Sequence, residues 1–96
     1  MDKKQRQKVL KLSKADVDAI RRILMDQWNP IGFAVPDDEY DSYIPGIYRL
    51  IQDGADAYKL AQRLLQLEMV SIGVQGNAER AERVANSLLA LRTSAF

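Results

Sequence analysis

The chain has 96 residues, 47% of them hydrophobic and 28% charged, which is the balance of a single soluble globular domain. It carries 14 basic and 13 acidic residues, so its net charge of +1 argues against a surface built as a whole to bind nucleic acid. Cysteine and histidine are both absent, which excludes disulfides, cysteine nucleophiles, and the commonest general base and zinc ligand.

The N-terminal segment is basic. Residues 1–14 carry six cations and one anion and reach no long apolar stretch, so we expect neither a secretory signal nor a membrane span, and a cytoplasmic location. Residues 1–12 form a basic arm, which could contact nucleic acid or an anionic membrane surface. A mobile, solvated tail is the interpretation that we favour.

The first helix is predicted to begin at Ser13, whose hydroxyl can accept from the backbone near Asp16. Leu12, just before this cap, is spaced as a hydrophobic staple with the first residue of the apolar stripe. Because the residue before a proline avoids helical geometry, Asn29-Pro30 should end the helix. The stripe recurs at intervals of 3, 4 and 4 and consists of Val17, Ile20, Leu24 and Trp28. The apolar loop that follows, residues 31–36, is expected to fold back onto the core.

The second helix is predicted within residues 38–53, ending at a left-handed Gly54. Pro45 allows two starts. Either Asp41 or Ser42 is the N-cap and Pro45 lies in the first turn, or the helix starts near Asp38 and kinks at the proline. We favour the earlier start.

Two more helices complete the pattern. Asp56 should open the third and Asn77 should cap the fourth, with Gly73 and Gly76 bracketing the break after Ile72. The third helix's apolar face is predicted to comprise Tyr58, Ala61, Leu64, Leu65 and Val70. The fourth helix's buried stripe is predicted to comprise Ala81, Val84, Ala85, Leu88, Leu89 and Leu91, and its solvated face Glu79, Arg80, Glu82, Arg83 and Arg92.

No segment alternates with a period of two residues, so the sequence predicts no strand. We therefore expect an all-α protein, with a single compact four-helix domain over residues 13–96 that follows the basic arm over residues 1–12.

The middle of the chain is both acidic and aromatic. Residues 36–56 carry six anions and one cation, and six of the seven aromatic residues fall between positions 28 and 58. Such a surface would steer and anchor a basic protein partner, although the same residues could simply cap and pack a helix. The candidate contacts are Glu39, Tyr40 and Tyr43, with Asp37 and Asp41 at the rim.

A carboxylate site is the alternative for this segment. Asp38 and Asp41 could hold a divalent cation weakly, although the spacing fails the pattern of a calcium loop because Ser42 stands where its glycine is needed. No catalytic group stands in a recognised geometry, so we expect no catalytic residues and no cofactor, and an enzyme less readily than a binding protein.

Three stretches together resemble the YugE-like family of small helical bacterial proteins. They are Trp28-Asn29-Pro30-Ile31-Gly32-Phe33, Asp38-Glu39-Tyr40-Asp41-Ser42-Tyr43, and residues 47–55, Ile-Tyr-Arg-Leu-Ile-Gln-Asp-Gly-Ala. The family shows a Trp-Asp-Pro-Ile-Gly turn, so Asn29 is a departure from its pattern, and the arm before Ser13 looks like an addition. The resemblance implies a compact helical fold and a bacterial source but brings no assigned activity.

These observations favour a non-catalytic interaction module that binds a basic protein, as an immunity or accessory factor would. The chain is expected to be a monomer or a weak homodimer, with nucleic acid and membrane unlikely as partners.

Overall fold

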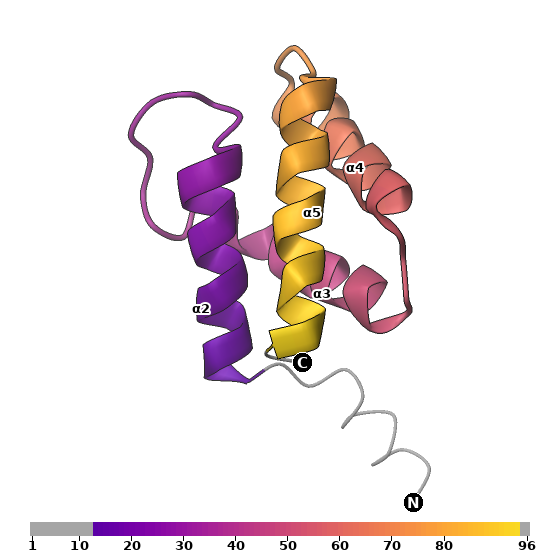
Figure 1. The fold of residues 1–96 in the computed structure, drawn as a ribbon. Helices are drawn as coiled ribbons and strands as arrows, with labels where there is room; N and C mark the ends of the chain where they lie inside the picture. The colour runs from indigo at the N-terminus through magenta and orange to yellow at the C-terminus, as the bar shows by residue number, and fades with distance from the viewer. Residues whose placement is uncertain (1–12, 95–96) are drawn as a thin grey trace, which may run out of the picture.

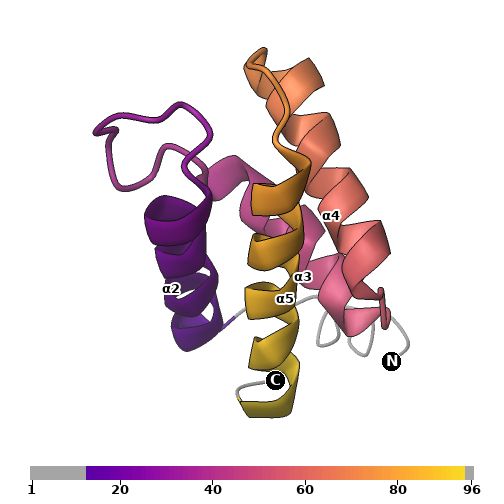
Figure 2. The same ribbon diagram turned by 45° about the horizontal axis from the view of Figure 1, so that its top comes forward.

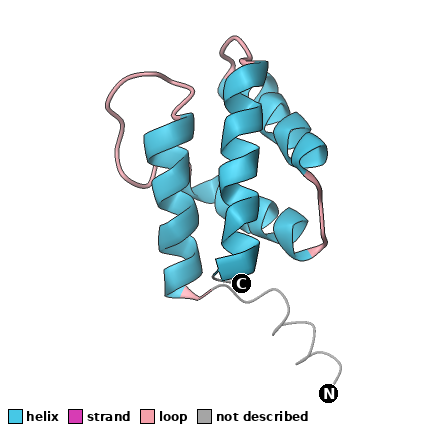
Figure 3. Ribbon diagram, viewed as in Figure 1, coloured by secondary structure: helices cyan, strands magenta, loops and turns pink. Residues whose placement is uncertain are grey.

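The computed structural model describes residues 13–94, with side chains described up to residue 91. The predictions for the arm, including the staple formed by Leu12, lie outside the described residues. Within residues 13–94 the chain forms helices joined by turns and loops, with no strand, as Figure 3 shows. The all-α prediction is confirmed for this part of the chain. No helix in it is both long enough and apolar enough to cross a bilayer.

Helix α2 runs over Lys14–Ile23 and continues into a π-helical turn, η1, over Leu24–Trp28. The predicted cap is confirmed, because Ser13 Oγ accepts a hydrogen bond of 3.0 Å from the backbone N–H of Asp16. The predicted stripe is buried at Ile20, Leu24 and Trp28, and Val17 packs against the same core. The helix ends before Pro30, as expected.

Helix α3 runs over Ile44–Gln52, after a 3₁₀ turn, η2, over Asp41–Tyr43. The earlier start near Asp38 is therefore wrong, and Pro45 lies in the first turn. Proline is tolerated there because its missing N–H would have no helical partner at that position. Gly54 ends the helix with a φ of 87°, as predicted.

Helix α4 runs over Ala57–Gln66 and continues into a second π-helical turn, η3, over Leu67–Ile72. Asp56 caps it by accepting from the Lys59 N–H at 2.8 Å. The predicted apolar face is wrong at two positions, since Tyr58 is 73% exposed and Val70 is 72% exposed. The buried side chains of this segment are Leu60, Ala61, Leu64, Leu67 and Glu68.

Helix α5 runs over Ala78–Ser94 and contacts each of the other three helices (Figure 1). Asn77 caps it, with its Oδ1 accepting from the Arg80 N–H at 2.9 Å. In Figure 2, α2 and α4 lie on either side of α5, while α3 crosses behind it. The core lies between these helices, and α5 contributes Ala81, Val84, Ala85 and Leu88 to it.

Candidate functional site: a buried carboxylate and the loop that it supports

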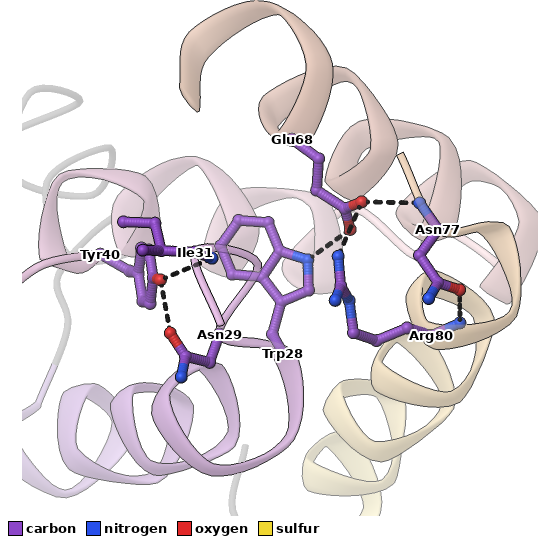
Figure 4. A network of polar contacts seen from close by, with 7 residues as sticks. All are labelled: Trp28, Asn29, Ile31, Tyr40, Glu68, Asn77 and Arg80. Carbon is purple, nitrogen blue, oxygen red and sulfur yellow. Dashed lines mark hydrogen bonds and ion pairs between the residues drawn. The ribbon is translucent and has the colours of Figure 1, made fainter. Parts of the chain in front are cut away.

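A completely buried carboxylate lies where three elements meet. Glu68 of η3 is 0% exposed, and its Oε2 accepts a 2.7 Å hydrogen bond from the indole N–H of Trp28 in η1. Its Oε1 accepts from the backbone N–H of Asn77 at 2.9 Å and from Nη2 of Arg80 at 3.1 Å (Figure 4). One side chain therefore ties η1, η3 and the start of α5 together.

Arg80 points inward to form this ion pair, so its predicted place on the solvated face is wrong. Its side chain is 19% exposed, and its buried Nε has no hydrogen-bond partner among the described residues. The guanidinium thus supplies the counter-charge that offsets the desolvation of Glu68.

The two π-helical turns carry two members of this network, Trp28 in η1 and Glu68 in η3. In each turn a backbone N–H bonds five residues back, from Asn29 to the Leu24 carbonyl at 2.8 Å and from Gly73 to the Glu68 carbonyl at 2.9 Å. A π turn is wider than an α turn, so it rotates the side chains at its end relative to the helix before it. The indole of Trp28, the last residue of η1, thereby faces Glu68.

Trp28 also supports the loop that follows it. Its ring contacts Tyr40 edge-on, with centroids 5.2 Å apart, and Tyr43 at 6.1 Å. The Tyr40 hydroxyl donates to Oδ1 of Asn29 at 2.7 Å and accepts from the Ile31 N–H at 3.3 Å (Figure 4). These bonds close the loop over residues 29–40 at its base. Burial of the Tyr40 ring raises the pKa of its hydroxyl.

Asn29 takes part in this closure through its backbone as well as its side chain. Its φ of 29° is positive, a conformation that asparagine tolerates better than most residues, and its Nδ2 donates to the Phe33 carbonyl at 3.3 Å. Asparagine suits this position, because an amide both donates and accepts here where a carboxylate would only accept.

A second contact, the clamp between Arg21 and Asp41, holds the C-terminal end of the loop. Arg21 of α2 binds Asp41 of η2 through two hydrogen bonds, Nε to Oδ1 at 2.9 Å and Nη2 to Oδ2 at 2.7 Å. Asp18 adds a contact of 3.1 Å to Nη1 of the same guanidinium. The hydrogen bonds from Arg21 lower the pKa of Asp41, and the same pair raises the pKa of Arg21.

The predicted contact residues separate into two groups. Asp37, Asp38 and Glu39 are exposed, as a contact surface requires. Tyr40 is only 2% exposed, so its predicted role as a surface contact is wrong, because its ring is packed on Trp28 and its hydroxyl closes the loop. Tyr43 is half-buried against Trp28.

Asp41 belongs to the clamp rather than to an open surface. Its two carboxylate oxygens bind Arg21, so a cation shared with Asp38 would have to displace the guanidinium. Among the described residues, no three acidic side chains lie close enough to hold a metal ion. Glu68 is also occupied, since both of its oxygens accept hydrogen bonds inside the core.

Sequence reasoning missed Glu68 and Phe33. Glu68 stands four residues beyond Leu64 and three beyond Leu65 in the predicted apolar stripe, where an acid signals a buried partner. The single tryptophan of the chain needs a hydrogen-bond acceptor for its N–H when buried, which was a second signal. Phe33, the other residue missed, is 69% exposed at the loop surface.

The sequence matches no protein-family model, no curated protein and no solved structure. The resemblance to the YugE-like family therefore stays a prediction.

Proposed function

We propose that this protein is a non-catalytic interaction module that binds a basic partner protein through the loop over residues 29–40. The observation that carries the proposal is an exposed aromatic ring, Phe33 at 69%, on the same short loop as three exposed acids. We name this set, Phe33, Asp37, Asp38 and Glu39, the acidic loop surface.

The loop is held before any partner arrives. Tyr40 and Asn29 close the base of the loop, and the pairing of Arg21 with Asp41 fixes its C-terminal end to α2. A surface that is already ordered loses less conformational entropy on binding, so more of the contact energy remains as affinity. The fixed ends thus favour recognition over a purely connecting role.

The chemistry of the loop favours a positively charged partner. Acids accelerate the encounter with a basic protein, while burial of an aromatic ring supplies affinity. Beside the loop, a hollow of about 330 Å³ is lined by three acids, two arginines and a methionine, namely Asp18, Asp26, Asp37, Arg21, Arg22 and Met25. Its three acids outnumber its two arginines, so the hollow is compatible with an inserted lysine or arginine side chain, whose stem is apolar and whose end is charged.

A basic nuclease-like toxin or a nucleic-acid-binding protein has this surface chemistry, and an immunity or accessory factor would act by covering it. Such a role, in the cytoplasm of a bacterium, agrees with the implied family and with the charge of the loop. It requires neither a cofactor nor a catalytic group.

The test is affinity capture from the native host followed by titration of the captured protein. Phe33→Ser and the pair Asp38→Lys/Glu39→Lys should each weaken binding at least about tenfold, since the loss of one anchor is worth about 1.4 kcal/mol or more. Added salt should weaken wild-type binding as well.

Val70→Ser and Asp53→Lys are matched controls, because both residues are exposed and lie away from the loop. They should leave affinity unchanged. If the loop variants stay folded and recover the same proteins with the same affinity as the controls, the acidic loop surface is not the interface.

A further inference from the structure

Helix α4 and the η3 turn that follows it carry a second apolar face, which the core covers only in part. Tyr58, Leu65 and Met69 follow one another at intervals of seven and four residues, which places them on one side of the helix. Tyr58 is 73% exposed and Met69 is 54% exposed, while Leu65 is half-buried. We name these three residues the α4 stripe. A helix with apolar residues on two sides usually has a partner on each.

The stripe borders a hollow between α4 and α5. This hollow has a volume of about 270 Å³ and is lined by Tyr58, Ala61 and Leu65 of α4 and by Ala78 and Glu82 of α5. The two alanines leave room for a large side chain between the helices. At the other end of the stripe, Met69 packs over Gly76, where a Cβ would lie 2.9 Å from its sulfur.

Charges of opposite sign flank the stripe. Glu82 lies on the α5 side and lines the hollow beside Tyr58. Lys59 is exposed and follows Tyr58 by one residue, a rotation of about 100° that carries it to the side of the helix away from α5. The two charges therefore lie on opposite flanks of the stripe.

We propose that a second copy of this chain covers the α4 stripe, with the two α4 helices parallel and related by a two-fold axis along them. This rotation places the two stripes face to face. It also places the α5 flank of each copy, which carries Glu82, beside the flank of its partner that carries Lys59. Each Glu82 then meets the partner subunit's Lys59. An antiparallel pairing would instead bring the two Glu82 side chains to the same edge, where they would repel.

The size and charge of the molecule fit a weak, reversible dimer. The net charge of +1 opposes association very little. The stripe spans eleven residues and thus about 17 Å of helix, which places the interface at the small end of specific ones, below about 1,200 Å² in total. The surface is separate from the acidic loop surface, so dimerisation does not depend on the proposed function.

The experiment is sedimentation of the full chain over a range of concentrations, with charge-swapped variants. Wild type should show a monomer–dimer equilibrium. Tyr58→Ser, Lys59→Glu and Glu82→Lys should each weaken the dimer at least about tenfold. The double variant Lys59→Glu/Glu82→Lys should recover most of the wild-type affinity, because it restores the pair with its signs exchanged.

Matched controls lie off the stripe. Val70→Ser removes an equally exposed apolar side chain from the η3 turn, and Asp53→Lys reverses a charge at the C-terminal cap of α3. Both should dimerise as wild type does, and circular dichroism should show every variant folded. A chain that stays monomeric up to about 1 mM overturns the proposal. A double swap that fails to recover affinity, or a dimer weakened by Val70→Ser but not by Tyr58→Ser, overturns it too.

Discussion

Glu68 combines a charge with complete burial. Taking a carboxylate out of water is costly, and it is offset here by an arginine and two further donors. Replacing such a cluster with apolar residues is often neutral, whereas breaking it leaves its other members unpaired. The contribution of Glu68 is therefore to fix the positions of Trp28 and the start of α5 relative to η3.

Glu68→Ala should destabilise the protein by about 3–5 kcal/mol, because it leaves Arg80 buried without a counter-charge and the Trp28 N–H without an acceptor. Urea unfolding measures the loss. Replacing Trp28 with Phe should cost less in the Glu68→Ala background than in wild type, since the hydrogen bond is already gone. Equal costs in both backgrounds would show that the two side chains are not coupled.

The pairing of Asp41 with Arg21 makes a pH-dependent contribution. The folded-state pKa of Asp41 is lowered by the hydrogen bonds from Arg21, so the stabilisation is present above the usual pKa of aspartate, about 3.9, and is lost as the pH falls through the lowered pKa. Asp41→Asn should therefore melt at a lower temperature than wild type at pH 7.

This difference in melting temperature should shrink as the pH falls below about 4, because the wild-type carboxylate becomes protonated as well. Thermal melts of the two proteins across this pH range measure it. Asp38→Asn is the control for loss of a charge from the same segment. A difference between Asp41→Asn and wild type that is independent of pH would contradict an ionic role for Asp41.

At the scale of the helices, the sequence predicted three helix starts from their N-caps but misplaced the start of α3, which lies next to a proline. Ser13, Asp56 and Asn77 act as caps through hydrogen bonds that their residue type and position allowed us to expect. The start of α3 was misplaced because proline is compatible both with a first turn and with a kink. Packing of Tyr40 on Trp28, a long-range contact, decides between them by holding residues 37–40 in turns.

The faces of α4 were harder to predict because the helix is apolar on two sides. Hydropathy assigned Tyr58 and Val70 to the core and passed over Glu68, whereas the structure buries the acid and exposes both apolar side chains. Val70 follows Glu68 by two residues, which puts it on the opposite side of the helix. A pattern of apolar residues cannot reveal that a distant tryptophan and arginine satisfy an acid.

Replacing Gly46 and Gly73 with alanine should change the free energy of unfolding in opposite directions. Gly46 lies inside α3 with open space around the position of a Cβ, so Gly46→Ala should stabilise the protein by about 0.5–1 kcal/mol. Gly73 ends η3 with a φ of 85°, where a side chain is strained, so Gly73→Ala should cost about 1–2 kcal/mol. Urea unfolding of both variants measures this, and a shift of the same sign in both would contradict the assignment.

The core positions of α3 and α4 should be the most sensitive to truncation. Ile47 is 1% exposed and Leu64 is 0% exposed, so Ile47→Ala and Leu64→Ala should each cost about 2–5 kcal/mol in free energy of unfolding. Val70→Ser is the control, since a residue 72% exposed should change that free energy by less than about 0.5 kcal/mol. A comparable loss in all three variants would mean that the faces are wrongly assigned.

At the scale of the whole molecule, one core joins all four helices, and α5 contacts each of the others. The sequence identified an acidic and aromatic segment but could not show which of its residues are exposed and which support the loop. Tyr40 and Asp41 hold the loop, whereas Asp37, Asp38 and Glu39 face solvent. That division depends on Arg21 and Asn29, which are distant in sequence from the residues that they bind.

Trp28 of η1 is the single tryptophan and contacts Glu68 of η3 and Tyr40 at the loop base, so its emission should report the state of the entire core. A small domain with one core unfolds cooperatively. Urea transitions followed by tryptophan emission and by far-ultraviolet circular dichroism should therefore coincide in wild type, and should shift together in Glu68→Ala. If the emission changed at lower urea than the helical signal, α2 and η1 would be separating from α4 and α5 first. The junction at Glu68 would then be the weakest seam of the fold, contrary to its role as the point that fixes these elements together.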